Sequence, residues 1–313
     1  MESNSKDSIF ITGATGFIGA NLARTLVTLH KDVHILVRPL SDTSRLTDII
    51  PQITIHEGDL LDKDNLKKII DSVKPRGVFH LAAKTVVLGV KSPEQEMISS
   101  NFEGTINILN VLENHDFDFF IESGTFIEYA PIPRPIKEDD LCEPKEIYGL
   151  TKLASTLYAK MIADTKGLPI IVFRFFTPFG PFLQKGKLVE QTITKAFKNE
   201  DIFLTKSSIA RDFIYIDDLI TLLLEASEKA KNLKGSIFNA GSGKKTTLKE
   251  FSDFVLKKTG SSSKIVWQEN KASIYDSDFW QADMTKVFDN FSWRPKYSLE
   301  EGLEKTIEYF KKS

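Results

Sequence analysis

The stretch Ile11-Thr12-Gly13-Ala14-Thr15-Gly16-Phe17-Ile18-Gly19 decides the fold of this 313-residue chain. It follows a short apolar run, Ser8–Thr12, and begins a helix-length amphipathic segment. The N-terminus of a helix presents free N–H groups and the positive end of the helix dipole, which suits a pyrophosphate. Gly13 permits a tight turn, Gly16 lets a phosphate approach the backbone, and Gly19 lets the helix pack closely on a sheet. The stretch therefore predicts a phosphate-binding loop.

The spacing of these glycines leaves more than one interpretation open. It is Gly-x-x-Gly-x-x-Gly rather than the Gly-x-Gly-x-x-Gly that is most common in dinucleotide-binding folds. A glycine triplet can also form a plain turn between a strand and a helix, but its place at the first such junction favours nucleotide binding. We therefore expect a dinucleotide to contact the loop and the start of the helix, at Gly13, Thr15, Gly16, Phe17, Ile18 and Gly19.

Short apolar runs alternate with helix-length amphipathic stretches through the first half of the chain. The runs that read as strands are 8–12, 33–37, 53–56, 77–80, 117–121 and 168–174. The stretches that read as helices lie near 17–30, 63–72, 94–114 and 147–166. Strands separated by helices indicate βαβ units with right-handed crossovers. The fold class is therefore expected to be α/β with a parallel sheet.

Composition excludes several classes of protein. The charges of 41 Lys and Arg residues nearly balance those of 43 Asp and Glu residues, which leaves a net charge of −2. Such a balance gives no overall field for nucleic acid or an anionic membrane, so we expect neither as a partner. The single cysteine, Cys142, excludes an internal disulfide and a thiolate metal site, and we expect no metal. With no signal peptide and no apolar run near the ~18 residues of a membrane span, we expect a soluble, cytoplasmic protein.

The end of the second strand indicates which dinucleotide binds. An acidic residue there favours an unphosphorylated adenosine ribose, but this chain has Arg38. Arg38, with Ser41 and Arg45, could hold a 2′-phosphate, so we expect NADP(H) as the cofactor, with NAD(H) as the alternative. Arg38 could also be an ordinary solvated arginine. Asp59, after the third strand, is expected at the adenine edge.

A tyrosine and a lysine lie one helical turn apart in Tyr148-Gly-Leu-Thr-Lys152, on the same face of the predicted helix. A free tyrosine, with a pKa of ~10, is a poor acid or base at neutral pH. A nearby lysine charge favours the phenolate and lowers that pKa. Thr125 ends the segment Phe120–Thr125, and its hydroxyl could steady a substrate carbonyl. Taken singly, each of these could be an ordinary surface residue.

Further segments add specific motifs along the chain. They are His80-Leu-Ala-Ala83, Asn101–Asn107, Arg174–Pro181, Arg211–Asp218, Asn239–Gly243 and Trp293–Gly302. Together with the glycine loop, Thr125 and the Tyr148–Lys152 pair, they resemble the extended short-chain dehydrogenase/reductase family, also known as the NAD-dependent epimerase/dehydratase family. The resemblance covers nearly the whole chain.

The resemblance implies a Rossmann-type doubly wound parallel sheet with a smaller C-terminal lobe that binds substrate. Residues 1–175 would form the NAD(P)-binding Rossmann domain, with a return segment near 209–235, and residues 176–208 and 236–313 would form the lobe. Members of the family usually pair through two helices, so a homodimer is expected through the helices near 94–114 and 147–166.

The resemblance also assigns roles to single residues. Tyr148 would be the general acid/base, Lys152 would bind the nicotinamide ribose and tune Tyr148, and Thr125 would orient a sugar oxygen. The cofactor would meet, besides these and the loop, Leu60, Leu81, Ala82 and Ala83. The substrate, a nucleotide-diphosphate sugar, would meet Thr125, Thr177, Arg211 and Asp276.

Two departures from the family narrow the reaction. Sugar 4,6-dehydratases have an Asp-Glu pair directly after the catalytic threonine, where this chain has Phe126 and Ile127. Neither side chain can transfer a proton, which argues against a dehydratase. Glu128 would point to the other face if the segment stays extended. UDP-glucuronate decarboxylases usually keep a glutamate in this stretch and are disfavoured too.

These considerations favour an NADPH-dependent 4-ketoreductase acting on a nucleotide-linked deoxysugar, similar to CDP-abequose and CDP-paratose synthases of O-antigen biosynthesis. The alternative is an NAD-dependent nucleotide-sugar 4-epimerase, which keeps its NAD bound and recycles the hydride. Arg38 discriminates between them, because only a net reductase needs an external NADPH pool. A non-catalytic dinucleotide sensor would not need Tyr148 and Lys152. A reductase of a non-nucleotide ketone would not need the segments from Arg211 to Gly302.

Overall fold

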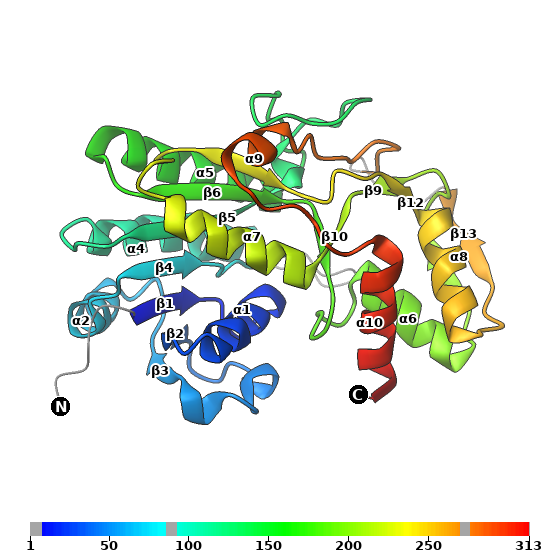
Figure 1. Ribbon diagram of the computed structural model, residues 1–313, viewed down its shortest axis with the longest axis horizontal. Coiled ribbons are helices and arrows are strands. Elements are labelled where there is room, and N and C mark those ends of the chain that lie inside the picture. The colour runs from blue at the N-terminus through cyan, green and yellow to red at the C-terminus, as the bar shows by residue number, and fades with distance from the viewer. Residues whose placement is uncertain (1–7, 86–92, 270–275, 313) are drawn as a thin grey trace.

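A computed structural model describes residues 8–85, 93–269 and 276–312, which form a large sheet covered by helices and a smaller C-terminal part beside it (Figure 1). The large sheet has seven parallel strands in the order β11-β6-β5-β4-β1-β2-β3. They are β1 (Ser8–Thr12), β2 (Asp32–Val37), β3 (Thr54–Glu57), β4 (Gly77–His80), β5 (Phe119–Thr125), β6 (Ile170–Phe175) and β11 (Ile237–Ala240). The order changes direction between β1 and β4, the kind of switch point at which open α/β sheets bind ligands. The predicted Rossmann-type doubly wound sheet is confirmed.

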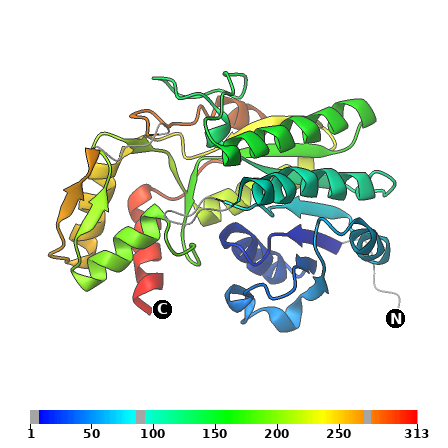
Figure 2. The ribbon, with the colours of Figure 1, turned by 180° about the vertical axis from the view of Figure 1, so that it is seen from behind.

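Helices cover both faces of this sheet. One face carries α2 (Lys63–Val73), α4 (Gly104–Leu112) and α5 (Ile147–Lys166), and Figure 2 shows α4 and α5 lying side by side over the strands. The other face carries α1 (Phe17–Thr28) and α7 (Ile216–Lys229), which contact each other. In the part of the chain that the structure describes, no helix is both long and apolar enough to cross a membrane.

The central strands are buried on both faces, which explains why they read as nearly continuous apolar runs. Alternate residues of each strand enter different cores. Phe10, Val78 and Phe120 pack on the side of α2, α4 and α5, and Ile11, Phe79 and Ile121 pack on the side of α1 and α7. Because the strands are parallel, the carboxyl ends of β1, β4 and β5 meet at one edge of the sheet.

Some boundaries differ from those predicted. The strand expected at 117–121 extends over β5 to Thr125, because the polar residues that follow Ile121 continue the ladder with β6. The helix expected near 94–114 consists of α3 (Glu94–Met97), a π-helical stretch η4 (Ile98–Glu103) and α4. The strand β11 lies in the large sheet beside β6, although the predicted division assigned residues 236–313 to the C-terminal lobe.

The C-terminal part combines helices with three two-stranded sheets, in which β10 pairs with β7, β12 with β9 and β13 with β8. The helices are α6 (Leu188–Lys198), α8 (Leu248–Thr259) and α10 (Leu299–Lys312), whereas α9 (Thr285–Asn290) packs against β11 of the large sheet. The strands are β7 (Thr177–Phe179), β8 (Ile202–Leu204), β9 (Ala210–Arg211), β10 (Phe213–Tyr215), β12 (Thr246–Thr247) and β13 (Ile265–Trp267). Short 3-10 helices are η2 (Ser44–Leu46), η3 (Ile50–Gln52) and η5 (Phe126–Glu128).

Asp212 ties three segments of this part together. Its buried carboxylate accepts hydrogen bonds from the N–H and hydroxyl of Ser242, from the N–H of Gly243 and from the N–H of Ala282. Four donors satisfy a charge that burial alone would make costly. These bonds hold the residues that follow β11, and the residues around Ala282, against Asp212 between β9 and β10.

Candidate active site

The glycine loop between β1 and α1 is tightly packed. Gly13 has a φ of +74°, and a Cβ there would lie 2.6 Å from the backbone nitrogen of Ala82. A Cβ on Gly19 would lie 2.3 Å from the carbonyl oxygen of Gly13. No side chain caps α1, which begins after Gly16, so its first N–H groups stay open to a ligand. The loop has the form that a bound phosphate requires.

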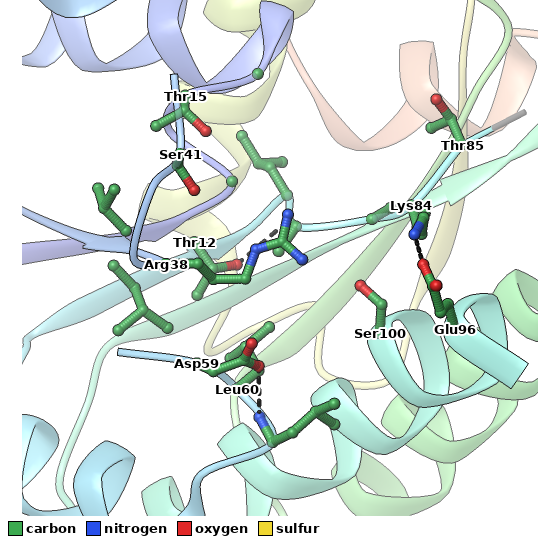
Figure 3. Close-up of a pocket in the computed structure, with 18 of the residues that line it drawn as sticks. Thr12, Thr15, Arg38, Ser41, Asp59, Leu60, Lys84, Thr85, Glu96 and Ser100 are labelled. Atoms are coloured by element: carbon green, nitrogen blue, oxygen red, sulfur yellow. Dashed lines mark hydrogen bonds and ion pairs between the residues drawn. The ribbon is translucent and has the colours of Figure 1, made fainter. Parts of the chain in front are cut away.

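A cavity of about 680 Å³ lies beside this loop at the switch point of the sheet (Figure 3). The predicted cofactor contacts that line it are Gly13, Thr15, Gly16, Arg38, Ser41, Asp59, Leu60, Leu81, Ala82 and Ala83. Those that do not line it are Phe17, Ile18, Gly19, Arg45, Tyr148 and Lys152. Size, position and lining suit a dinucleotide, whose contacts with these residues stay a prediction.

Arg38 and Arg45 differ in their surroundings. The exposed Arg38 side chain extends over the cavity between Ser41 and Asp59, and it makes no hydrogen bond or ion pair with another described residue (Figure 3). Arg45 instead donates to the carbonyl oxygens of Phe182, at 2.9 Å, and Thr15, at 3.3 Å. Arg45 therefore braces the outer side of the loop, which leaves Arg38 as the guanidinium available to a ligand.

The opposite end of the cavity holds charged and polar residues that the sequence did not single out. Lys84 and Glu96 form an ion pair there, with Ser100 nearby (Figure 3). The amide of Asn101 holds the backbone of Lys84 through two hydrogen bonds and donates a third to the hydroxyl of Thr151 on α5. The end of the cavity is thereby joined to the helix that carries Tyr148. The sequence signal was the position of Lys84, directly after the His80–Ala83 motif.

The structure brings Thr125 and Tyr148 together. Thr125 ends β5, Tyr148 lies in the first turn of α5, and their side chains share a hydrogen bond. Burial raises the pKa of Tyr148 to about 12, and the hydrogen bond from Thr125 opposes this rise. A phenol with that pKa is protonated at neutral pH and can donate a proton to an oxygen beside it.

Lys152, one turn after Tyr148, lies deeper in the molecule. Its amine donates a 3.2 Å hydrogen bond to the carboxylate of Glu122 on β5, and both side chains are almost completely buried. Burial raises the pKa of Glu122 to about 7, and the Lys152 charge opposes this rise. The sequence analysis overlooked Glu122, although a lone charged residue within the apolar strand Phe119–Thr125 was a signal.

The residues after Thr125 do not continue as an extended strand. They form the 3-10 helix η5, whose turn brings the Glu128 side chain back so that it accepts a 2.9 Å hydrogen bond from the Thr125 N–H. Glu128 also accepts from Thr156 and pairs with Arg174 at 2.7 Å. The expectation for Glu128 assumed an extended segment and is corrected: its carboxylate is buried and bound.

Phe126 belongs to an apolar cluster next to Thr125. Its ring stacks on Phe176 at a centroid distance of 5.5 Å and meets Trp280 edge-on at 4.9 Å. In the C-terminal part, Arg211 pairs with Asp276 at 3.1 Å, so these two predicted substrate contacts lie together. Thr177, the third, starts β7 and donates its N–H to the backbone carbonyl oxygen of Asp212.

Comparisons with known proteins agree with this geometry. The model of a family described as "NAD dependent epimerase/dehydratase family" matches residues 9–241. The UDP-N-acetyl-alpha-D-glucosaminuronate decarboxylase of Bacillus cytotoxicus is 30% identical, over 98% of both chains. The UDP-glucose 4-epimerase of Thermotoga maritima, solved with UDP-glucose, superposes with a TM-score of 0.89 at 26% identity, over 97% of this chain and 99% of that one.

A second solved structure is similar to the same extent. The UDP-glucuronic acid 4-epimerase of Bacillus cereus, in complex with UDP-glucuronic acid and NAD, has a TM-score of 0.87 at 26% identity, over 97% of this chain and 99% of that one. These relatives are epimerases and a decarboxylase rather than 4-ketoreductases. The comparisons thus favour the alternative over the function that the sequence analysis put first.

Proposed function

Because the chain belongs to the NAD-dependent epimerase/dehydratase family, we propose that it is an enzyme that uses a nicotinamide dinucleotide to invert C4 of a nucleotide-linked sugar. The observation that carries the proposal is the hydrogen-bonded pair Thr125 and Tyr148 at the carboxyl edge of the sheet. Asn101 connects the helix that carries Tyr148 to the dinucleotide-sized cavity. A proton donor and a redox cofactor are the two requirements for chemistry at a carbinol carbon.

The chain has residues that fit the cofactor. Gly13 and Gly19 leave room where a Cβ would collide with backbone, and the open N–H groups of α1 face the loop. Arg38 and Asp59 would meet the adenosine half, and Ala82 and its neighbours would meet the rest. When bound, the nicotinamide would accept a hydride from C4 and return it.

The protein's own residues would handle the proton. After losing its own proton, Tyr148 would act as a phenolate: it would take the proton of the C4 hydroxyl as the C4–H bond breaks and give it back when the hydride returns to the other face. Thr125 would hydrogen-bond to the same oxygen and keep it in line with the phenol. Phe126 and Ile127 supply no further acid or base, so the chemistry stops at C4 and no C5–C6 elimination follows.

A nucleotide-diphosphate sugar is the substrate class that we propose. Arg211 offers a guanidinium in the C-terminal part, where Asp276 holds it in position. Guanidinium groups bind diphosphates through paired, charge-assisted hydrogen bonds. The solved neighbours contain UDP-sugars, which makes UDP-glucose, UDP-glucuronate and UDP-N-acetylglucosamine the first substrates to test.

Arg38 supports a second candidate, the NADPH-dependent reduction of a 4-keto deoxysugar linked to a nucleotide. Its guanidinium is unpaired among the described residues and extends over the cavity where an acid would be expected in an NAD enzyme. Tyr148 would then only donate its proton, and NADP(H) would exchange with solution after every turnover.

The test is to incubate the purified protein and NAD with each UDP-sugar and identify products by NMR. The proposal expects a 4-epimer with no net change in NAD, and a loss of turnover of roughly 10²- to 10⁴-fold in Tyr148→Phe. Oxidation of C4 in UDP-glucuronate makes its carboxylate a β-keto acid, so release of CO₂ would indicate a decarboxylase. Consumption of NADPH with a 4-keto deoxysugar, and no epimer, would support the second candidate.

We further propose that the enzyme is a homodimer through α4 and α5. Leu150, Leu157 and Met161 are about half exposed and lie along one side of α5. Large apolar side chains aligned on one helix face are typical of a contact surface. The neighbouring α4 packs against α5 and would share the same surface.

A further inference from the structure

Three adjacent strands place polar side chains next to each other beneath Lys152. In the sheet register Thr12 of β1 is opposite His80 of β4, and His80 is opposite Glu122 of β5. Side chains alternate along a strand, so all three point to the face that carries α4 and α5. Each is buried, although the preceding strand residues on this face, Phe10, Val78 and Phe120, are apolar.

Hydrogen bonds link Thr12 and His80 to Thr105 in a line. Thr105 on α4 donates its own hydroxyl proton to the carbonyl oxygen of Asn101, so it accepts from Nε2 of His80 at 3.1 Å. The neutral ring then has no proton on Nδ1, and the Thr12 hydroxyl, 2.7 Å away, donates to that nitrogen. Burial, helped by the charge of Lys152, lowers the pKa of His80 to about 3. The imidazole is therefore neutral and brings no charge to the site.

Glu122 lies beside His80 on the next strand, and only one of its two carboxylate oxygens is hydrogen-bonded. Its Oε1 accepts from Lys152, whereas Oε2 is buried and has no hydrogen-bond partner among the described residues. Nε2 of His80 is 3.9 Å from that oxygen, beyond hydrogen-bond distance. A buried carboxylate with an unpaired oxygen costs free energy. Stability alone therefore gives no reason for a glutamate at this position.

The pairing has a consequence for the phenol one turn away. Among the described residues, the Lys152 amine donates only to Glu122. The polar groups that act on Tyr148 are Thr125 from β5, Glu128 from η5 and Glu146 before α5. Both glutamates disfavour the phenolate, and among the described residues no cation acts on the phenol to oppose them. The Glu122 carboxylate thus neutralises the charge of Lys152, and this charge does not stabilise the phenolate of Tyr148.

We propose that Glu122 is a positioning residue that holds the Lys152 ammonium away from Tyr148 and cancels its charge, so that the cofactor-free protein keeps Tyr148 protonated. The inference rests on Tyr148 being the acid/base of the proposed function. In the cofactor-free protein Lys152 forms a buried ion pair with Glu122. Its ammonium must leave Glu122 before it can favour the phenolate form of Tyr148.

The test follows ionisation of Tyr148 in the cofactor-free protein and needs no substrate. The chain has seven tyrosines, so the tyrosinate absorbance of Tyr148→Phe is subtracted from that of the unaltered protein at each pH. The difference should show no ionisation of Tyr148 below pH ~10, the ordinary tyrosine value. Ionisation near neutral pH would overturn the inference.

Substitutions at Glu122 separate charge from packing. Glu122→Gln keeps the size of the side chain but removes its charge, and Tyr148 should then ionise about 1 to 3 pH units lower, the range for an opposite charge nearby. Glu122→Asp keeps the charge and should leave Tyr148 as it is in the parent. Each variant is compared with its own Tyr148→Phe double variant.

The matched control is Glu190→Gln. Glu190 is also a buried carboxylate, but it lies on α6 and accepts from the Gly186 N–H and from Thr194. Its substitution should leave the Tyr148 titration unchanged. A Glu122→Gln titration equal to that of the parent would contradict the inference.

A second variant keeps the test decisive if Glu122→Gln does not fold. The double variant Glu122→Gln/Lys152→Met removes both charges together and leaves no unpaired buried charge, which proteins tolerate better. In the double variant Tyr148 should ionise at the same pH as in the parent. If Tyr148 ionises at a higher pH in the double variant, Lys152 already stabilises the phenolate in the parent, and the inference is contradicted. Failure to convert any nucleotide sugar would overturn the proposed function without changing these titrations.

Discussion

Single residues determine which hydride chemistry this fold can perform. Tyr148 and Thr125 share a hydrogen bond, while Phe126 and Ile127 provide no second acid or base. The sequence predicted this set because Tyr148 and Lys152 are spaced by one helical turn. It did not predict the Glu122 partner of Lys152, because a contact between a strand and a helix 30 residues apart leaves no periodic pattern.

The choice of cofactor is testable at Arg38. If this guanidinium binds a 2′-phosphate, Arg38→Asp should lower the preference for NADPH over NADH by roughly 10- to 150-fold, the effect of losing a charged hydrogen bond. Dissociation constants for both cofactors, measured by fluorescence, give the ratio. Arg45→Gln is the control: Arg45 bonds to backbone carbonyls and should alter both affinities alike. An unchanged ratio in Arg38→Asp would show that Arg38 does not bind the 2′-phosphate and is an ordinary surface residue.

His80 should make stability depend on pH. Its pKa is about 3 in the folded protein, below the ordinary 6.5, so the unfolded chain binds a proton first as the pH falls. Stability from neutral His80 is therefore full above pH 6.5 and is lost below it, by about 2 kcal/mol between pH ~7 and pH ~5. Denaturant unfolding of the parent and His80→Gln at both pH values measures this.

The difference between the two proteins isolates His80 from the other titrating groups. Glu122 has a raised pKa and contributes the opposite slope, but it is present in both proteins and cancels to first order. The advantage of the parent over His80→Gln should therefore shrink on acidification. An advantage that stays constant between the two pH values would mean that His80 takes up its proton in the fold at the same pH as in the unfolded chain.

At the scale of elements, the alternation of apolar runs and amphipathic stretches predicted six strands of the large sheet, β1 to β6, but not its seventh strand, β11. Local geometry was harder to predict. The 3-10 helix η5 turns Glu128 toward Arg174, because its capping box with Thr125 competes with an extended strand. The π-helical stretch η4 lies within the segment that the sequence analysis expected as one helix, and it was not predicted.

The glycine loop is the element whose shape is most sensitive to substitution. Gly13→Ala would add strain at a positive φ and a Cβ 2.6 Å from the Ala82 nitrogen, so the loop must shift. We expect at least a tenfold loss of dinucleotide affinity, measured by titration calorimetry, because the N–H groups of the shifted loop would no longer point at the phosphate. Gly260→Ala has a similar φ of +64° but open space around it, and should keep the affinity. Equal affinities in both variants would contradict a phosphate role for the loop.

At the scale of the whole molecule, the proposed dimer makes the apolar side of α5 a partner surface. Leu157→Asp should then give a monomer in light scattering where the parent gives a dimer, because burying an unpaired carboxylate costs several kcal/mol, of order 2 to 5. Leu141 is 68% exposed and lies outside α5, so Leu141→Asp should leave the dimer intact. A monomeric parent would contradict the proposed pairing.

The arrangement of the two parts was only partly predictable. The strand β11 returns to the large sheet from a region of sequence that otherwise builds the C-terminal part, and nothing in its short apolar run indicates which sheet it joins. Asp212 illustrates the same difficulty, since its four hydrogen bonds come from segments 30 and 70 residues away. Long-range pairings of this kind depend on the assembled fold.

The most direct test of the proposed function follows a deuterium atom placed at C4 of whichever UDP-sugar the protein converts. If a hydride leaves C4 and returns to the opposite face, the 4-epimer should retain the deuterium in ordinary water, with no net consumption of NAD or NADPH. Tyr148→Phe should form this product at least 10²-fold more slowly. An epimer that has lost the deuterium to solvent, or NADPH oxidation matched to reduction of a 4-keto sugar with no epimer formed, would contradict the account.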